Sequence, residues 1–150
     1  SLTKELIDNT LNEVFSKVNP ECIVTHSAAD IHFEHRLINQ EVLYSLDSEN
    51  NTYIKQLWTT VSQTYSYAYN QFSVYQPNIF IDISQYIQHK KNALNQYSIA
   101  HEIPYNTDNR SILACINYNR QLGFHVNRQY CEAYQQIFSL FETSEDNCLF

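Results

Sequence analysis

Two histidines and two carboxylates lie within the short stretch Ala29 to Arg36, which reads ADIHFEHR. His32 and His35 are three residues apart, so on one helical turn both side chains project from the same face and could bind one ligand or one metal ion. The positive end of a helix disfavours a protonated imidazole there, which favours a neutral, coordinating histidine. Asp30 and Glu34 favour the protonated form instead. The pair could therefore supply one metal ligand and one proton donor.

A simpler interpretation of the same stretch is a solvated helix end. Histidines near a helix start are common without any ligand, beside the side chains that cap the helix. Zinc also needs at least three protein ligands, and this stretch offers one or two convincing ones. From residue types and spacing alone, both interpretations stay open.

The elements around this stretch can be predicted from hydrophobic periodicity. Apolar residues recur at helical spacing from Leu2 to Val18, and Asn19-Pro20 ends the pattern. The β-branched run CIVT at 22–25 predicts a buried strand. Helical spacing resumes beyond the histidines, so a second helix is predicted to begin between Asp30 and Glu34. The order is helix, strand, histidine loop and helix.

Further along the chain, strands and helices are predicted to alternate. We expect strands at 53–61 and 78–84, with a long surface excursion at 62–77 between them. Ser84 is placed to cap a following helix, and two more helices are predicted at Ser111–Gln121 and Arg128–Phe141. Such alternation predicts one α/β domain over residues 1–150 with a mostly parallel sheet. Ligands bind beyond the carboxyl ends of strands in these folds, which is where ADIHFEHR lies.

Composition excludes several classes of function. A net charge of −7 and a pI near 5.2 argue against a nucleic-acid partner, because phosphate binding needs a cationic face. No apolar run has the length of a membrane span and no signal peptide opens the chain, so we expect a cytoplasmic protein. The four cysteines form no C-x-x-C pair, which predicts reduced thiols. A single glycine, Gly123, argues against a phosphate-cradling loop.

Three ordered segments resemble a known enzyme family. The first is NPECIVTHSAADIHFEHRLINQEVL, the second is PNIFIDIS followed by KKNAL and Tyr97, and the third is QYCEAYQQIF. They are similar to motif blocks of the PIG-L/LmbE-like zinc-dependent N-acetylglucosaminyl deacetylases. The resemblance covers nearly the whole chain and implies a Rossmann-like, three-layer α/β fold.

The resemblance also implies roles for the residues of the first block. By it, His35 is a zinc ligand, and His32 stabilises the oxyanion and protonates the departing amine. Asp30 matches an acidic position of the family, and we expect it to orient His32. Zinc (Zn2+) would polarise the acetamide carbonyl and lower the pKa of a bound water, which a carboxylate base deprotonates. The implied substrate is an N-acetylated amino sugar.

The sequence departs from the family pattern at several positions, two of which concern the site itself. Glu34 replaces the usual Asp, and no His-Pro-Asp-Asp-Glu stretch, which in the family supplies the other ligands and the base, occurs in the 150 residues. The chain therefore resembles the C-terminal two-thirds of a deacetylase, with a sheet incomplete at the N-terminus. By itself we expect it to be inactive and to form homo-oligomers through an exposed sheet edge. The alternative is a truncated or decayed, non-catalytic homologue that acts at most as a sugar-binding module.

A few further side chains could contribute to a site. His26 ends the predicted strand and could lie next to the metal, although a histidine there is commonly a plain hydrogen-bonding residue. Glu132 is expected to have a structural role on the last predicted helix. The alternating tyrosines Tyr65, Tyr67 and Tyr69 could stack on a sugar or form one face of a strand.

Overall fold

The computed structural model describes residues 3–46, 51, 53–61, 75–100 and 111–141. Tyr65, Tyr67, Tyr69 and most of the predicted surface excursion lie outside these ranges. The elements are α1 (Lys4–Val18), β1 (Cys22–His26), α2 (Phe33–Leu46), β2 (Gln56–Thr60), β3 (Ile79–Asp82), the short 3-10 helix η2 (Ser84–Tyr86), α3 (Ile87–Ala100), α4 (Ile112–His125) and β4 (Cys131–Ser139). This arrangement confirms the predicted α/β class.

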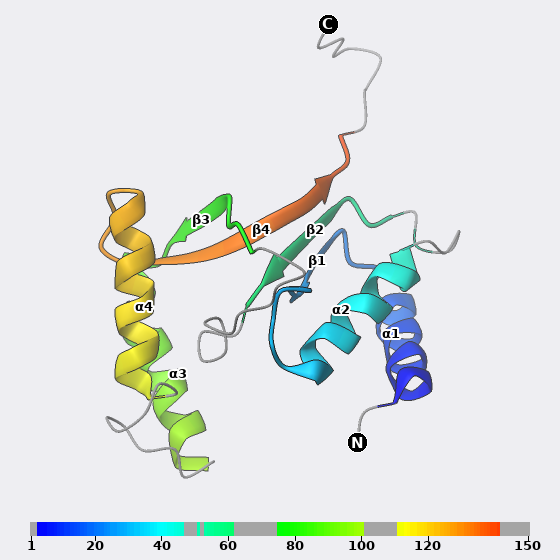
Figure 1. Ribbon diagram of the computed structural model, residues 1–150, viewed down its shortest axis with the longest axis horizontal. Coiled ribbons are helices and arrows are strands. Elements are labelled where there is room, and N and C mark those ends of the chain that lie inside the picture. The colour runs from blue at the N-terminus through cyan, green and yellow to red at the C-terminus, as the bar shows by residue number, and fades with distance from the viewer. Residues whose placement is uncertain (1–2, 47–50, 52, 62–74, 101–110, 142–150) are drawn as a thin grey trace, which may run out of the picture.

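The four strands form one sheet in the order β1-β2-β4-β3 (Figure 1). β1 and β2 are parallel, whereas β4 lies between β2 and β3 and is antiparallel to both. The prediction of a mostly parallel sheet is therefore wrong. The three predicted strands do run in one direction, because β2 and β3 are each antiparallel to β4. The sheet is mixed because β4 is inserted between β2 and β3 and runs in the opposite direction.

The helix predicted at Arg128–Phe141 is wrong, because residues 131–139 form β4. Cys131 and Ala133 are buried while the residues between and after them are less so, which is the period of a strand. Both edges of β4 are hydrogen-bonded to neighbouring strands, and this tertiary pairing outweighs the helix propensity of residues such as Glu132 and Ala133.

The first helix shows how local sequence sets its ends. Thr3 accepts a hydrogen bond from the Leu6 N–H at 3.3 Å, which caps the N-terminus. Asn19 adopts a left-handed conformation with φ of 46°, and its N–H bonds to the carbonyl of Phe15. The helix therefore ends where the Asn19-Pro20 pair predicted, and α2 begins at Phe33, inside the predicted window.

Ser84 does not cap a helix with its side chain as predicted. Its hydroxyl donates to Asp82 Oδ1 at 2.6 Å and accepts from the Tyr130 N–H at 3.1 Å. Ser84 begins the short helix η2, and α3 follows from Ile87. The hydroxyl thus joins the end of β3 to the beginning of β4.

Two apolar clusters hold the elements to the sheet. Phe15, Ile23, Val42, Ile54 and Leu57 join α1 and α2 to β1 and β2. Figure 1 shows these two helices side by side at one end of the sheet, with α3 and α4 at the other. There, Leu122, Cys131 and Ala133 join α4 to β4.

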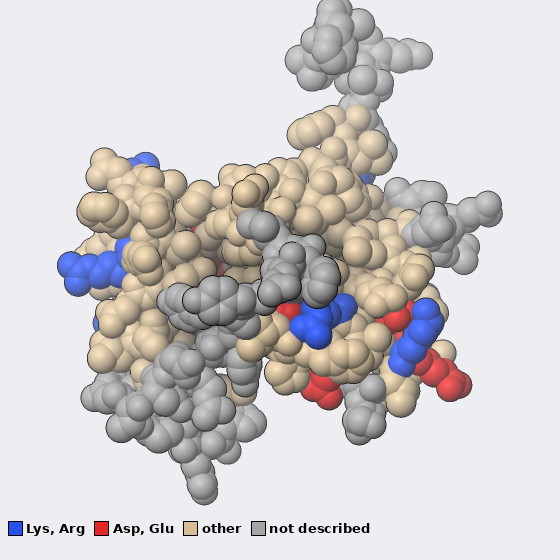
Figure 2. Space-filling model, viewed as in Figure 1, with Lys and Arg blue, Asp and Glu red and all other residues tan. Residues whose placement is uncertain are grey.

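The positively charged residues and the cysteines are both few and spread over the described structure. In the view of Figure 2, Lys and Arg side chains are scattered and form no continuous patch. Cys22, Cys115 and Cys131 are free thiols, and Cys148 lies outside the described residues. Among the described helices, none is both long and apolar enough to cross a membrane.

Candidate metal centre

The candidate site lies at the carboxyl end of β1, where the chain turns into α2. The β1–β2 ladder continues beyond His26, because the Ser27 N–H donates to the Thr60 carbonyl at 2.7 Å. Ser27 then shapes the turn: its hydroxyl accepts from the Ala29 N–H at 3.1 Å, and its carbonyl accepts from the Asp30 N–H at 3.0 Å. This turn directs Asp30 inward, where its side chain is completely buried.

Asp30 links the two histidines of the sequence motif. Its Oδ2 lies 2.9 Å from Nδ1 of His35, and its Oδ1 accepts a hydrogen bond from the His32 backbone N–H at 2.9 Å. The carboxylate therefore fixes the imidazole of His35 and the backbone position of His32. We expected Asp30 to orient His32; the contact that the structure shows is to the His32 backbone N–H, and the orienting role stays a prediction.

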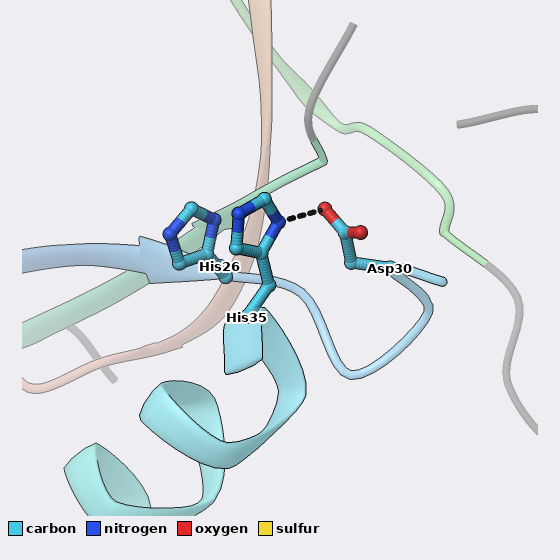
Figure 3. Close-up of side chains that lie close together, drawn as sticks. All are labelled: His26, Asp30 and His35. Carbon is cyan, nitrogen blue, oxygen red and sulfur yellow. Dashed lines mark hydrogen bonds and ion pairs between the residues drawn. The ribbon is translucent and has the colours of Figure 1, made fainter. Parts of the chain in front are cut away.

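His26 lies closer to the motif than we expected from the sequence. Its ring is stacked on that of His35, with centroids 3.9 Å apart and planes 2° from parallel (Figure 3). The His32 ring is tilted by 34° to that of His35, at a centroid distance of 4.6 Å. Three imidazoles from a strand end, a loop and the first turn of a helix thus meet at one point.

The surroundings of His26 favour its neutral form. Burial lowers its pKa, and His35 and His32 lower it further against the opposing effect of Asp30. Its Nδ1 is buried and has no hydrogen-bond partner among the described residues. A neutral imidazole with a buried, unsatisfied nitrogen is suited to metal coordination.

Side-chain hydrogen bonds from two residues of α2 hold the loop against this helix. Asn39 donates from Nδ2 to the His26 carbonyl at 2.7 Å and is itself buried. Arg36 donates from Nη1 to the Asp30 carbonyl at 2.9 Å and also to the Ile31 carbonyl. These polar contacts satisfy backbone carbonyls that the turn would otherwise leave without partners.

His26, Asp30 and His35 form a candidate metal-binding triad. One ligand atom from each residue lies within 4.8 Å of those of the other two. Two imidazole nitrogens and one carboxylate oxygen are ligands that zinc accepts, and three protein ligands leave a position open for a water or substrate. The residues present therefore fit zinc, and His26, Asp30 and His35 are the ones that could hold it.

The sequence predicts roles for Asp30 and His35 and leaves His26 open, and the structure brings the three side chains together. The signal that could have found His26 is its position: it ends the strand that leads into the motif, and strand ends are where ligands bind in α/β folds. His89 and His125 are exposed and lie on α3 and α4, away from this triad in the chain and in the fold.

Similar proteins were found by comparison of structures and not by comparison of sequences. No model of a known protein family matches the sequence, and no curated protein matches it in sequence. A crystal structure of the conserved protein TT1542 from Thermus thermophilus is similar, with a TM-score of 0.66 and 12% identity over 95% of this chain. The zinc-inhibited form of teicoplanin deacetylase Orf2 is also similar, with a TM-score of 0.68 and 14% identity over 93% of this chain.

The two structural relatives are longer than this chain. The match covers 63% of the Thermus protein and 53% of the teicoplanin deacetylase. At such low identities, the likeness concerns the arrangement of the backbone. The chain therefore shares its fold with part of a deacetylase that was crystallised in a zinc-inhibited form.

Proposed function

We propose that this protein is a zinc-dependent hydrolase that removes the N-acetyl group from an N-acetylated amino sugar. The observation that carries the proposal is the triad of His26, Asp30 and His35 at the carboxyl end of β1. Its support is the fold shared with a deacetylase and the three sequence blocks that resemble the PIG-L/LmbE-like family.

In this proposal the metal is held by His26, Asp30 and His35. Bound there, zinc would polarise the acetamide carbonyl and lower the pKa of a coordinated water, whose proton a carboxylate base would take so that hydroxide attacks the carbonyl carbon. Asp30 has a second task, because its other oxygen holds the His32 N–H at 2.9 Å. Metal binding and the position of His32 are thus coupled through one carboxylate.

His32 is proposed to act on the substrate. Its ring lies beside that of His35, at a centroid distance of 4.6 Å, so it faces the same space as the metal ligands. From there its imidazole can stabilise the oxyanion that forms on the amide carbonyl and deliver a proton to the departing nitrogen. The products are acetate and a free amino sugar.

The experiment that tests the metal centre is a zinc titration by calorimetry. We expect His35→Ala to weaken zinc binding by at least about 100-fold, since altering a residue that merely orients a ligand already costs 10–100-fold. His89→Ala is the matched control, because it removes an exposed histidine from α3 and should leave binding unchanged. Zinc binding by His35→Ala at full strength would contradict the ligand assignment.

A non-catalytic, sugar-binding role is the second candidate. The observation that favours it is that the triad contains one carboxylate, Asp30, which already contacts His35 and the His32 N–H. Within the triad, no second carboxylate can then act as the base that deprotonates the water. Acetate release from N-acetylglucosamine in the presence of zinc distinguishes the two. Turnover that is lost in His32→Ala supports the hydrolase and overturns the expectation that these 150 residues are inactive by themselves, whereas sugar binding that needs no zinc supports the binding module.

A further inference from the structure

A pocket with a volume of about 290 Å³ opens at the carboxyl end of β2. Thr60, at the end of β2, lines this pocket and is the parallel register partner of His26. Paired residues of neighbouring strands project from the same face of a sheet. The pocket and the triad therefore both lie at the carboxyl ends of the neighbouring parallel strands β1 and β2.

The pocket contains a fixed carboxylate. Glu132 of β4 accepts a hydrogen bond from Lys90 Nζ on its Oε1 at 2.6 Å and another from the Tyr134 hydroxyl on its Oε2 at 2.8 Å. Burial opposes ionisation of Glu132, but these two hydrogen bonds outweigh it and lower the pKa of the carboxyl. Each carboxylate oxygen can accept two hydrogen bonds, so Lys90 and Tyr134 occupy one acceptor position on each oxygen.

Aromatic side chains form the remaining walls. Tyr75, Tyr118 and Tyr134 line the pocket together with the apolar side chains of Val61 and Leu122. The Tyr75 hydroxyl donates to the Ala133 carbonyl at 2.9 Å, and burial raises its pKa to about 12, so it stays neutral and fixed. Flat apolar faces beside a charged acceptor suit a ring with C–H groups on its faces and hydroxyl groups on its edge.

We propose that this pocket binds the hydroxyl-bearing ring of the substrate and that Glu132 is a specificity-determining residue that accepts hydrogen bonds from the ring hydroxyls. This inference rests on the proposed function, which places the bond to be cleaved at the triad. The volume is at the lower end for ligand pockets, which favours a single sugar ring over a longer oligosaccharide. Lys90 and Tyr134 are positioning residues that hold the Glu132 carboxylate.

Trp58 provides a direct readout of ligand binding. It is the one tryptophan of the chain, and its ring centroid lies 5.9 Å from that of Tyr134. We would titrate the zinc-loaded protein with N-acetylglucosamine and with N-cyclohexylacetamide, which carries the same amide on a ring without hydroxyl groups. We expect a saturable change in Trp58 fluorescence with the sugar, and at least about tenfold weaker binding of the cyclohexyl compound because its ring has no hydroxyl group to donate to Glu132. Equal binding of the two compounds would overturn the proposal.

Variants locate the effect in the pocket. Glu132→Gln should weaken sugar binding by about tenfold or more while zinc affinity stays within about twofold. Tyr134→Phe keeps the ring and removes the hydroxyl that holds Glu132, so it should weaken sugar binding to a smaller extent. Glu13→Gln is the matched control, an exposed carboxylate on α1 paired with Lys17. Either pocket variant that binds both zinc and sugar like the wild type would contradict the proposal.

Zinc binding separates the two possible failures. A wild-type protein that does not bind zinc would contradict the proposed function. A protein that binds zinc but shows no preference for the hydroxyl-bearing ring would contradict this inference and leave the metal centre standing. A pocket variant that loses zinc is scored as misfolded, and the comparison of the two compounds on the wild type then decides.

Discussion

Asp30 is the residue on which the arrangement of the histidines most depends. It is completely buried, and its two oxygens contact two different histidines. A buried carboxylate without partners would be costly, so its position is stable because His35 and the His32 N–H are there. His35 and His32 are held in turn because each of them contacts one oxygen of the carboxylate.

Replacing Asp30 with Asn tests this arrangement. The amide oxygen can still accept from the His32 N–H, but an NH₂ group replaces the oxygen that faces His35, and the negative charge is lost. We expect zinc affinity to fall by about 10–100-fold or more and the free energy of unfolding to fall by about 1–3 kcal/mol. Calorimetry and urea denaturation measure the two effects. Glu34→Gln is the control. If it lowers zinc affinity and stability as much as Asp30→Asn does, the effect comes from removing one negative charge near the site and not from the position of Asp30.

At the scale of elements, the contact between the end of α4 and the beginning of β4 depends on a missing side chain. A Cβ on Gly123 would lie 2.6 Å from the Arg128 carbonyl oxygen and 2.9 Å from the Tyr130 nitrogen. The Gly123 carbonyl also accepts from the N–H groups of Val126 and Arg128, which closes the turn. The single glycine of the chain thus permits a close backbone approach.

We therefore expect Gly123→Ala to destabilise the protein even though alanine has the higher helix propensity. The added methyl group meets backbone rather than a movable side chain, and such overpacking costs about 1–3 kcal/mol. Urea denaturation measures the loss. Asn117→Ala, at an exposed position of the same helix, is the control and should be neutral or slightly stabilising. A stabilised Gly123→Ala variant would show that the turn can move.

The ion pair between Lys90 and Glu132 joins α3 to β4 and makes stability depend on pH. The pKa of Glu132 is lower in the folded protein than in the unfolded chain, where it is about 4.5. The unfolded state therefore binds more protons, and the contribution is present above about pH 4.5 and is lost as the pH falls through the lowered folded pKa. Glu132→Gln should reduce the free energy of unfolding by about 1–2 kcal/mol at neutral pH and flatten the acid part of its pH profile. An unchanged slope below pH 4.5 would contradict this.

At the scale of the whole molecule, β1 is at one edge of the described sheet. It pairs with β2 and with no other described strand, and Val24 on it is 51% exposed. An edge strand with an exposed β-branched residue is a surface on which another strand can pair. We therefore keep the proposal that the protein forms homo-oligomers.

Val24→Lys should reduce this association, because a lysine on an edge strand opposes pairing with another strand. Sedimentation at several protein concentrations measures it, and we expect the variant to shift toward the monomer. Val14→Lys changes an exposed valine on α1 and should leave association unchanged. A wild-type protein that is monomeric at every concentration would contradict the proposal.

The sequence by itself determined the local elements and the chemistry of the motif. Helical spacing and the Asn19-Pro20 pair defined α1, and the β-branched run defined β1, because these signals come from residues near one another in the chain. The sequence also indicated His35, His32 and Asp30 as a group, since they share one turn of chain. Their catalytic and ligand roles stay predictions.

Only the tertiary structure decided how distant segments combine. Residues 131–139 form a strand because β2 and β3 provide partners for both edges, and no local pattern records those partners. His26 lies in the candidate metal-binding triad for a similar reason: it is on the strand and His35 on the helix, and the turn through Ser27 stacks their rings at 3.9 Å. Likewise, Lys90 and Glu132 are 42 residues apart and meet only because α3 and β4 fold together. Long-range pairing depends on which surfaces are buried together, and a periodicity confined to one segment cannot encode it.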